Sequence, residues 1–152
     1  MKKVLKGFTL IELLVVIGIL AILLAITLIA INPARQFGQA NNTKRRSETL
    51  QILNAIHQYV AETGGNLPPA VAALSVTVPT TFSGANMATL CGNLMPNYIP
   101  ALPQEPSIGG VNITDCAVTT WNTGYQVSRD AANRITVSSP ITDNGATISV
   151  TR

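Results

Sequence analysis

Charged, aromatic and metal-binding residues are scarce in this sequence of 152 residues. Only 11% of the residues are charged and 5% are aromatic, and there is one histidine and two cysteines. One histidine and seven acidic residues leave little material for general acid–base catalysis. The two cysteines match no zinc pattern, and no phosphate-binding loop, HExxH or GxSxG motif occurs. We therefore predict no catalytic residue, no cofactor and no metal site.

The charge balance also argues against electrostatic binding of nucleic acid. The formal net charge is +3, but Lys2, Lys3 and Lys6 all precede Gly7. Without residues 1–7, the chain has seven basic and seven acidic residues. A nearly neutral chain lacks the positive field that attracts a phosphate backbone. Nucleic acid is therefore not an expected partner.

What the sequence does contain is one long apolar run near its N-terminus. No charged residue occurs from 13 to 31, whereas the rest of the chain is rich in Thr, Asn and Pro. As a helix, residues 8–31 would be roughly 36 Å long, which is enough to cross a bilayer. Because the lysines precede this run, the N-terminus is expected in the cytoplasm and the soluble part outside. The sequence thus predicts a single-pass membrane protein.

A secretory signal peptide is the main alternative for this segment. The run is long for a signal-peptide core, and no clear small-x-small cleavage site follows it, although Ala25 and Ala30 keep the alternative open. Glu12 also lies inside the apolar run, where an ionised carboxylate costs free energy. Neither a signal peptide nor a plain membrane anchor explains this carboxylate.

The residues around Glu12 form a recognisable pattern. Residues 6–23 read KGFTLIELLVVIGILAIL. This stretch closely resembles the N-terminus of type IV pilins and type II secretion pseudopilins. The resemblance implies that a prepilin peptidase removes a leader, residues 1–7, by cutting between Gly7 and Phe8, and then N-methylates Phe8. The mature subunit would wait in the membrane, and an inner-membrane assembly platform would move it into an extracellular or periplasmic filament.

Within that family role, Glu12 would guide filament assembly. Cleavage creates a cationic amine at Phe8, and Glu12 lies one helical turn further on. In a filament core this carboxylate can pair with the amine of an adjacent subunit, and a buried charge without a partner disfavours wrong registers. The alternative is that Glu12 is a tolerated interfacial carboxylate without a partner.

The chain departs from the family in one respect. Many members carry a proline late in the apolar helix, around the position of Ile29, whereas this chain has Asn32-Pro33. A proline inside a helix removes a backbone hydrogen bond and kinks or breaks the helix. We therefore expect a kink or break just past the membrane.

Residues 32–65 predict an amphipathic continuation of the helix. Apolar residues recur at three- and four-residue steps and form one stripe, which ends before the stop signal Gly64-Gly65. His57 lies on this stripe and is expected to be a hydrogen-bonded core residue. The stripe contains Leu50, Leu53, Ile56, His57 and Val60, and is widened by Ile52, Ala55 and Tyr59.

The densest basic cluster of the expected mature chain is Lys44-Arg45-Arg46. We expect a solvated helix face or a subunit contact here, with Glu48 as the local partner of Lys44. Contact with lipid headgroups or with DNA is a further alternative. No aromatic residue is interleaved with the cluster, which disfavours a surface for stacking bases.

The remaining residues predict loops followed by a sheet. Residues 66–122 are rich in turn formers, with a short helix expected at 87–95 and Asn86 as its cap. Alternation of apolar and polar residues predicts strands at 124–129, 134–139 and 146–151 within residues 123–152. The inward residues of these strands are expected to be Tyr125, Val127, Ile135, Val137, Ile148 and Val150.

The expected fold class is therefore α+β and pilin-like. The long N-terminal helix would be membrane-spanning in its first half (8–31) and amphipathic in its second half (32–65). The second half would pack on a small antiparallel β-sheet of three or four strands.

Cys91 and Cys116 are the only cysteines. An oxidising location outside the membrane favours a disulfide between them, and two unpaired buried thiols are the alternative. In the chain-entropy model, closing this loop would add roughly 3–4 kcal/mol to the stability.

Together these features predict a structural subunit that is not an enzyme. It would form a homo-oligomeric helical filament, either a type IV pilus or a pseudopilus. Prepilin peptidase, the inner-membrane assembly platform and membrane lipid are the expected partners. Two alternatives stay open: a minor pilin that binds DNA or a surface, and a soluble domain released by cleavage beyond residue 25.

Overall fold

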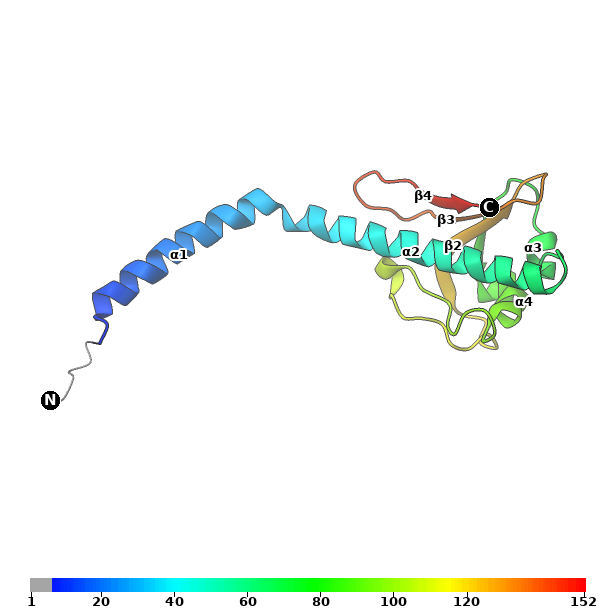
Figure 1. Cartoon of the computed structure of the whole chain (residues 1–152), viewed down its shortest axis with the longest axis horizontal. Coiled ribbons are helices and arrows are strands. Elements are labelled where there is room, and N and C mark those ends of the chain that lie inside the picture. Colours follow the sequence, from blue (N-terminus) through cyan, green and yellow to red (C-terminus); the bar gives the residue numbers. More distant parts are fainter. Residues whose placement is uncertain (1–6) are drawn as a thin grey trace. The chain divides into compact units, whose positions relative to one another are not determined.

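The computed structural model describes residues 7–152, so Lys2, Lys3 and Lys6 of the predicted leader lie outside the described residues. The chain divides after Phe37 into two compact units, which we describe separately. The first unit contains α1 (Leu10–Ile31) and the start of α2 (Pro33–Glu62), and the second contains everything from Gly38 onward. Figure 1 shows these elements along the chain.

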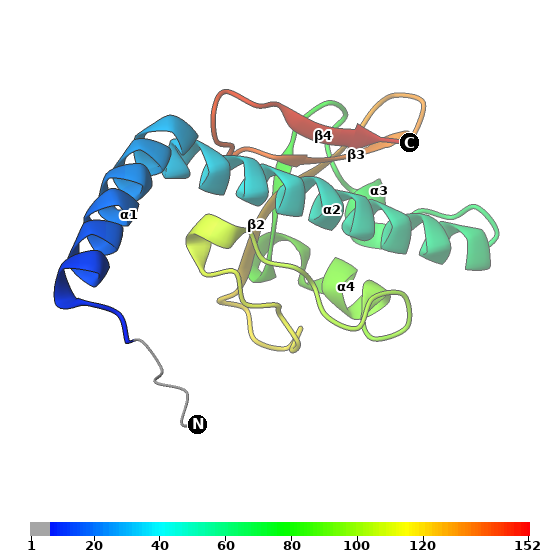
Figure 2. The ribbon, with the colours of Figure 1, turned by 60° about the vertical axis from the view of Figure 1, so that its left-hand side comes forward.

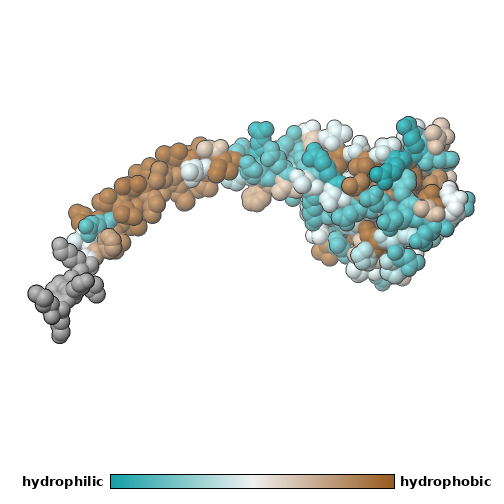
Figure 3. Space-filling view, in the orientation of Figure 1, coloured by the Kyte–Doolittle hydropathy of each residue, from teal (hydrophilic) through white to brown (hydrophobic). Residues whose placement is uncertain are grey.

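Beyond Glu12 in its first turn, α1 is apolar on every side, and none of its residues is buried. Its 22 residues correspond to about 33 Å of helix. By length and composition it could cross a membrane. Figure 3 shows a hydrophobic surface along this helix. A helix that is hydrophobic all round needs lipid or other protein segments around it.

Asn32 forms the junction between the two helices. It ends α1 in the left-handed conformation, with φ 47° and ψ 79°. Its side-chain Oδ1 also accepts a hydrogen bond from the N–H of Arg35 at 3.3 Å. Asparagine tolerates the left-handed region and caps helix N-termini well, and Pro33 suits a first helical position. The predicted break at Asn32-Pro33 is therefore confirmed.

In the second unit, α2 contributes one face to the hydrophobic core. Ile52, Leu53, Ala55 and Ile56 are buried there. Leu50, which the sequence pattern placed on the inward stripe, is 40% exposed, so that prediction is wrong. The true stripe is displaced because Arg45, Thr49 and Ile52 set the buried face of the helix.

The sheet is a four-stranded antiparallel meander in the order β1-β2-β3-β4. Its strands are β1 (Thr80–Ser83), β2 (Asn122–Arg129), β3 (Ile135–Ser139) and β4 (Ile148–Thr151). The predicted inward residues of the second and third strands are fully buried, and Val127 faces Val137 in the register. Figure 2 shows α2 running along this sheet. The predicted α+β, pilin-like fold is thus confirmed.

Segment 66–122 contains more regular structure than the sequence indicated. It supplies β1, α3 (Pro69–Ala72), α4 (Gly84–Leu94) and the 3₁₀ turn η1 (Pro106–Ile108). The predicted helix at 87–95 therefore begins earlier, and Ser83 rather than Asn86 occupies its N-cap position. The early turn is irregular at Met87, and pairing of β1 with β2 places Ser83 at the start of the helix.

Candidate functional site

The predicted cleavage site lies just before α1. Gly7, Phe8 and Thr9 are outside the helix, and Phe8 is 85% exposed. Thr9 is the N-cap of α1. The bond between Gly7 and Phe8 therefore lies in exposed chain before the helix rather than inside a helical turn. Cleavage there and methylation of Phe8 stay predictions.

Thr9 and Glu12 form a reciprocal capping box at the start of α1. The N–H of Thr9 and its hydroxyl both donate to Glu12 Oε2, each at 2.7 Å. In return, Thr9 Oγ1 accepts the N–H of Glu12 at 3.3 Å. The carboxylate thus accepts the N–H at the N-terminus of α1 that has no partner within the helix. Its negative charge also lies at the positive, N-terminal end of the helix dipole, which is favourable.

Glu12 is surrounded by apolar side chains on the helix surface. Phe8, Ile11, Val15 and Val16 line a shallow hollow with it. Within residues 7–152, no basic side chain lies within salt-bridge distance of this carboxylate. The Glu12 carboxylate, on an exposed apolar helix, can therefore form an ion pair with a cation from outside the chain. Its role in assembly stays a prediction.

The comparison with protein families identifies this segment. Residues 3–28 match the family model of the prokaryotic N-terminal methylation motif. The chain carries the prepilin-type motif of type IV pilins and pseudopilins. No curated protein and no solved structure matched the chain. The prepilin-type motif covers α1 up to residue 28 and none of the second unit.

The most heavily bonded residue of the second unit is Arg45, which the sequence pattern placed in a solvated basic cluster. That prediction is wrong, because the Arg45 side chain is 0% exposed. Its Nε donates to Glu105 Oε1 at 2.6 Å, and its Nη1 donates to Asp143 Oδ2 at 2.6 Å. Asn42 Oδ1 and Ser107 Oγ accept its other bonds, at 2.8 and 2.9 Å.

These bonds place the single cation of Arg45 between two carboxylates. Burial lowers the pKa of the Arg45 guanidinium, but the bonds to Asp143 and Glu105 outweigh this effect and raise it overall. Glu105 is also fully buried, and its second oxygen accepts the N–H of Ser107 at 2.8 Å. A buried ion pair with satisfied hydrogen bonds specifies one arrangement of the segments that it joins.

The Arg45 cluster therefore fixes two distant loops to α2. Glu105 and Ser107 belong to the η1 turn, and Asp143 belongs to the loop between β3 and β4. The latter loop packs so closely that a Cβ on Gly38 would lie 2.7 Å from Asn144 Nδ2. Gly38 thus permits the close approach. No local sequence signal indicated this arrangement.

Beside Arg45, Glu48 accepts a hydrogen bond from the Tyr125 hydroxyl of β2. Burial, and then this bond to Glu48, raise the pKa of Tyr125 far above its usual value. Glu48 also lies 3.7 Å from Lys44, which confirms the predicted pair of these two residues. Glu48 thus connects α2 to the sheet.

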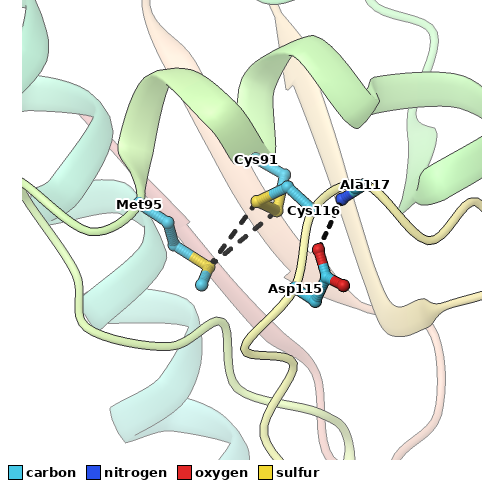
Figure 4. The surroundings of a disulfide bond; sticks show 5 residues. All are labelled: Cys91, Met95, Asp115, Cys116 and Ala117. Carbon is cyan, nitrogen blue, oxygen red and sulfur yellow. Dashed lines mark hydrogen bonds between the residues drawn. A yellow bond between two sulfur atoms is a disulfide. The ribbon is translucent and has the colours of Figure 1, made fainter.

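The two cysteines are joined, as predicted. Cys91 of α4 and Cys116 form a disulfide with a Cα–Cα distance of 5.6 Å. Met95 Sδ lies within 3.9 Å of both sulfurs (Figure 4). The bridge closes the loop that carries the η1 turn.

His57 has no ligand-like surroundings. It is partly buried, and its Nε2 has no hydrogen-bond partner. Burial, and then the nearby charge of Arg152, lower its pKa, while a backbone bond to Arg152 acts in the opposite direction. Among residues 7–152, no group of three His, Cys, Asp or Glu side chains could hold a metal ion.

Proposed function

We propose that this chain is a structural subunit of a type IV pilus or of a type II secretion pseudopilus. In this role the chain is cut between Gly7 and Phe8, methylated at Phe8, and polymerised through α1. The observation that carries the proposal is the prepilin-type motif over residues 3–28, on a helix that buries none of its residues. Proteins with this motif are structural subunits rather than enzymes.

The assembly step follows from the chemistry of the helix start. After cleavage, Phe8 carries a free cationic amine, one turn before Glu12. The apolar surface of α1 supplies packing area between subunits, which is the main stabilising term. The Glu12 carboxylate determines how neighbouring subunits align along the filament, since burial of this carboxylate without a cationic partner costs free energy. Before assembly, the N–H and hydroxyl of Thr9 donate hydrogen bonds to the Glu12 carboxylate. In the filament, the amine of a neighbouring subunit becomes the partner of this carboxylate.

The location follows from the same features. Before assembly, α1 spans the cytoplasmic membrane with the leader in the cytoplasm and the second unit outside. After assembly, α1 lies in the filament core and the second unit lies on its surface. Prepilin peptidase and an inner-membrane assembly platform are the partners that this sequence of events requires.

Replacing Glu12 tests the proposal. We expect Glu12→Leu subunits to be processed but to give at least ten-fold fewer filaments, measured by shearing and quantifying surface fibres. Thr27→Leu is the matched control, because it also makes α1 more apolar but removes no carboxylate. Mass spectrometry of the sheared fibre should show N-methylated Phe8 as its first residue.

Two results would contradict the proposal. Normal fibre yield from processed Glu12→Leu subunits would remove the carboxylate from the assembly mechanism. A mature N-terminus beyond residue 25 would instead identify a released soluble domain.

A further inference from the structure

The thioether of Met95 lies against the disulfide bridge. Met95 directly follows α4, and its N–H donates to the Cys91 carbonyl at 2.9 Å, which fixes it one helical turn after that cysteine. Residues four apart on a helix lie on the same face, so the Met95 side chain reaches the bridge. Its Sδ lies 3.9 Å from the sulfur of Cys91 and 3.8 Å from that of Cys116 (Figure 4). One thioether therefore contacts both sulfurs.

The two methionines within residues 7–152 differ in how well solvent reaches them. Met87 is 1% exposed and belongs to the hydrophobic core. Met95 is only partly buried and packs against the same core. Because oxidation of a sulfur-containing side chain follows its access to the oxidant, Met95 is the more reactive of the two. Met87 provides an internal reference in the same chain.

The two cysteines of the bridge also differ in exposure. Cys91 is fully buried, whereas Cys116 is only partly buried. A thiol that reduces a disulfide must reach one of its sulfurs, and Cys116 is the cysteine that solvent reaches. The contact with Met95 Sδ blocks approach to the Cys116 sulfur from one direction. The thioether thus covers part of the bridge.

We propose that Met95 is a site of oxidation by peroxides, and that its oxidation exposes the Cys91–Cys116 bridge to reduction by thiols. In the first step, the thioether sulfur attacks one peroxide oxygen, the O–O bond breaks, and the sulfoxide forms with release of water. Later, a thiolate attacks the Cys116 sulfur, the S–S bond breaks, and its electron pair leaves on the Cys91 sulfur. A second thiolate then releases the Cys116 thiolate, and the two attacking thiols end as a disulfide.

A change in polarity connects the two steps. A thioether is apolar and packs well against the bridge, whereas a sulfoxide is polar and its oxygen requires a hydrogen-bond donor. The N–H of Ala117, next to Cys116 in the chain, already donates to Asp115 Oδ1 at 2.8 Å (Figure 4). Because a buried polar group without a partner costs free energy, the sulfoxide turns toward water. This movement uncovers Cys116.

Opening of the bridge would free residues that hold the second unit together. The segment between the two cysteines includes Glu105 and Ser107, and both bind the buried side chain of Arg45. The oxidation state of Met95 therefore determines how long the bridge that restrains these residues survives in the presence of thiols.

Peroxide treatment of the full chain in detergent tests both steps. Peptide mass spectrometry follows sulfoxide formation at each methionine. After the hydrogen peroxide is removed, dithiothreitol is added, and alkylation of the released thiols measures the rate at which the bridge opens. We expect Met95 to be oxidised roughly ten-fold faster than Met87, and the bridge of the oxidised chain to open roughly five-fold faster than that of the untreated chain.

Met95→Leu is the matched control, because leucine keeps an apolar side chain of similar size that peroxide does not convert to a sulfoxide. Its bridge should open at the same rate with and without peroxide treatment. Met95→Gln places a polar amide at the same position, and its bridge should open faster without any peroxide. Met87→Leu keeps Met95 in place and should behave like the unchanged chain.

Equal rates of oxidation at Met87 and Met95 would overturn the inference, as would a rate of bridge opening that oxidation leaves unchanged. Faster opening in peroxide-treated Met95→Leu would also contradict it, since the effect would then come from another residue. None of these outcomes involves Glu12, so the fibre yield of Glu12→Leu subunits tests the proposed function independently.

Discussion

Single residues determine how the second unit is held together, and Arg45 is the clearest case. Its guanidinium joins α2 to Glu105 and Asp143, and it has no contact with solvent. Lys44 and Arg46 have similar chemistry but are exposed. The three adjacent basic residues therefore have different roles, which depend only on the direction in which each side chain points.

Replacing Arg45 should be far more costly than replacing its neighbour. We expect Arg45→Met to lower the free energy of unfolding by about 3–5 kcal/mol, because Glu105 is left buried without its cation. Arg46→Met should change it by less than about 0.5 kcal/mol. Urea unfolding of the full chain in detergent, followed by Trp121 fluorescence, measures both.

A second substitution separates charge from packing. Adding Glu105→Gln to Arg45→Met removes the unpaired carboxylate and should recover at least half of the loss. If Arg45→Met were as stable as Arg46→Met, the buried ion pair would not contribute to the stability of the unit.

His57 gives a prediction about pH, and as the only histidine it can be assigned without ambiguity. Burial and the Arg152 charge lower its pKa below 6.5 in the folded chain. The unfolded chain therefore binds a proton first as the pH falls. The associated stability is complete above pH 6.5 and is lost as the pH falls through the folded-state pKa.

Titration of the imidazole signal by NMR checks this prediction. The folded chain should give a pKa below that of the same chain in concentrated urea, and His57→Gln should remove this part of the pH dependence of unfolding. A folded-state pKa equal to or above the unfolded value would contradict it.

At the scale of elements, the junction between α1 and α2 depends on one asparagine. Asn32 ends α1 in the left-handed region and caps α2 through its side chain. Both tasks suit a short polar side chain. Pro33 has no backbone N–H, so α1 cannot continue into α2 with an uninterrupted series of backbone hydrogen bonds. The two helices are thus separate elements because of two adjacent residues.

Substitution of Asn32 should loosen the start of α2. Asn32→Ala loses the cap, at a cost of about 1 kcal/mol, and places alanine in an unfavourable backbone region. We expect the Arg35 and Gln36 amides to exchange hydrogen at least five-fold faster. Asn32→Gly removes the cap but tolerates the backbone conformation, so its effect should be smaller. Slower exchange in Asn32→Ala would show a helix that runs through the junction.

At the scale of the whole molecule, the second unit combines a small core with cross-links between distant segments. One is the Cys91–Cys116 bridge, which spans 25 residues of sequence. The other is the Arg45 cluster, whose partners lie on the η1 turn inside that bridged loop and on the β3–β4 loop. Both cross-links therefore hold the same loop, the bridge at its two ends and the Arg45 cluster at the η1 turn.

Removing the bridge should destabilise the whole unit. We expect Cys91→Ser with Cys116→Ser to lower the free energy of unfolding by roughly 3 kcal/mol, chiefly because the unfolded chain gains freedom. Urea unfolding in detergent measures the change, and the unchanged chain with reducing agent is the control. A loss of less than about 1 kcal/mol in both samples would show that the bridge adds little to stability.

Much of this protein could be predicted from local sequence patterns. The apolar run predicts α1, the Asn32-Pro33 pair predicts its end, and alternation predicts the inward residues of β2 and β3. The prepilin-type motif is likewise contiguous, so the candidate processing site needs no tertiary information. Periodicity, turn chemistry and composition act between near neighbours in the chain.

Only the tertiary structure decided the role of Arg45, the exposure of Leu50 and the existence of β1. Arg45 meets Glu105 and Asp143, which lie 60 and 98 residues away, and the local sequence describes the basic cluster as an ordinary solvated surface. β1 has four residues and acquires its identity by pairing with β2. The physical reason is that burial and long-range pairing depend on residues far apart in the sequence that meet only in the folded chain. Helix and strand periodicity, in contrast, can be read from neighbouring residues in the sequence.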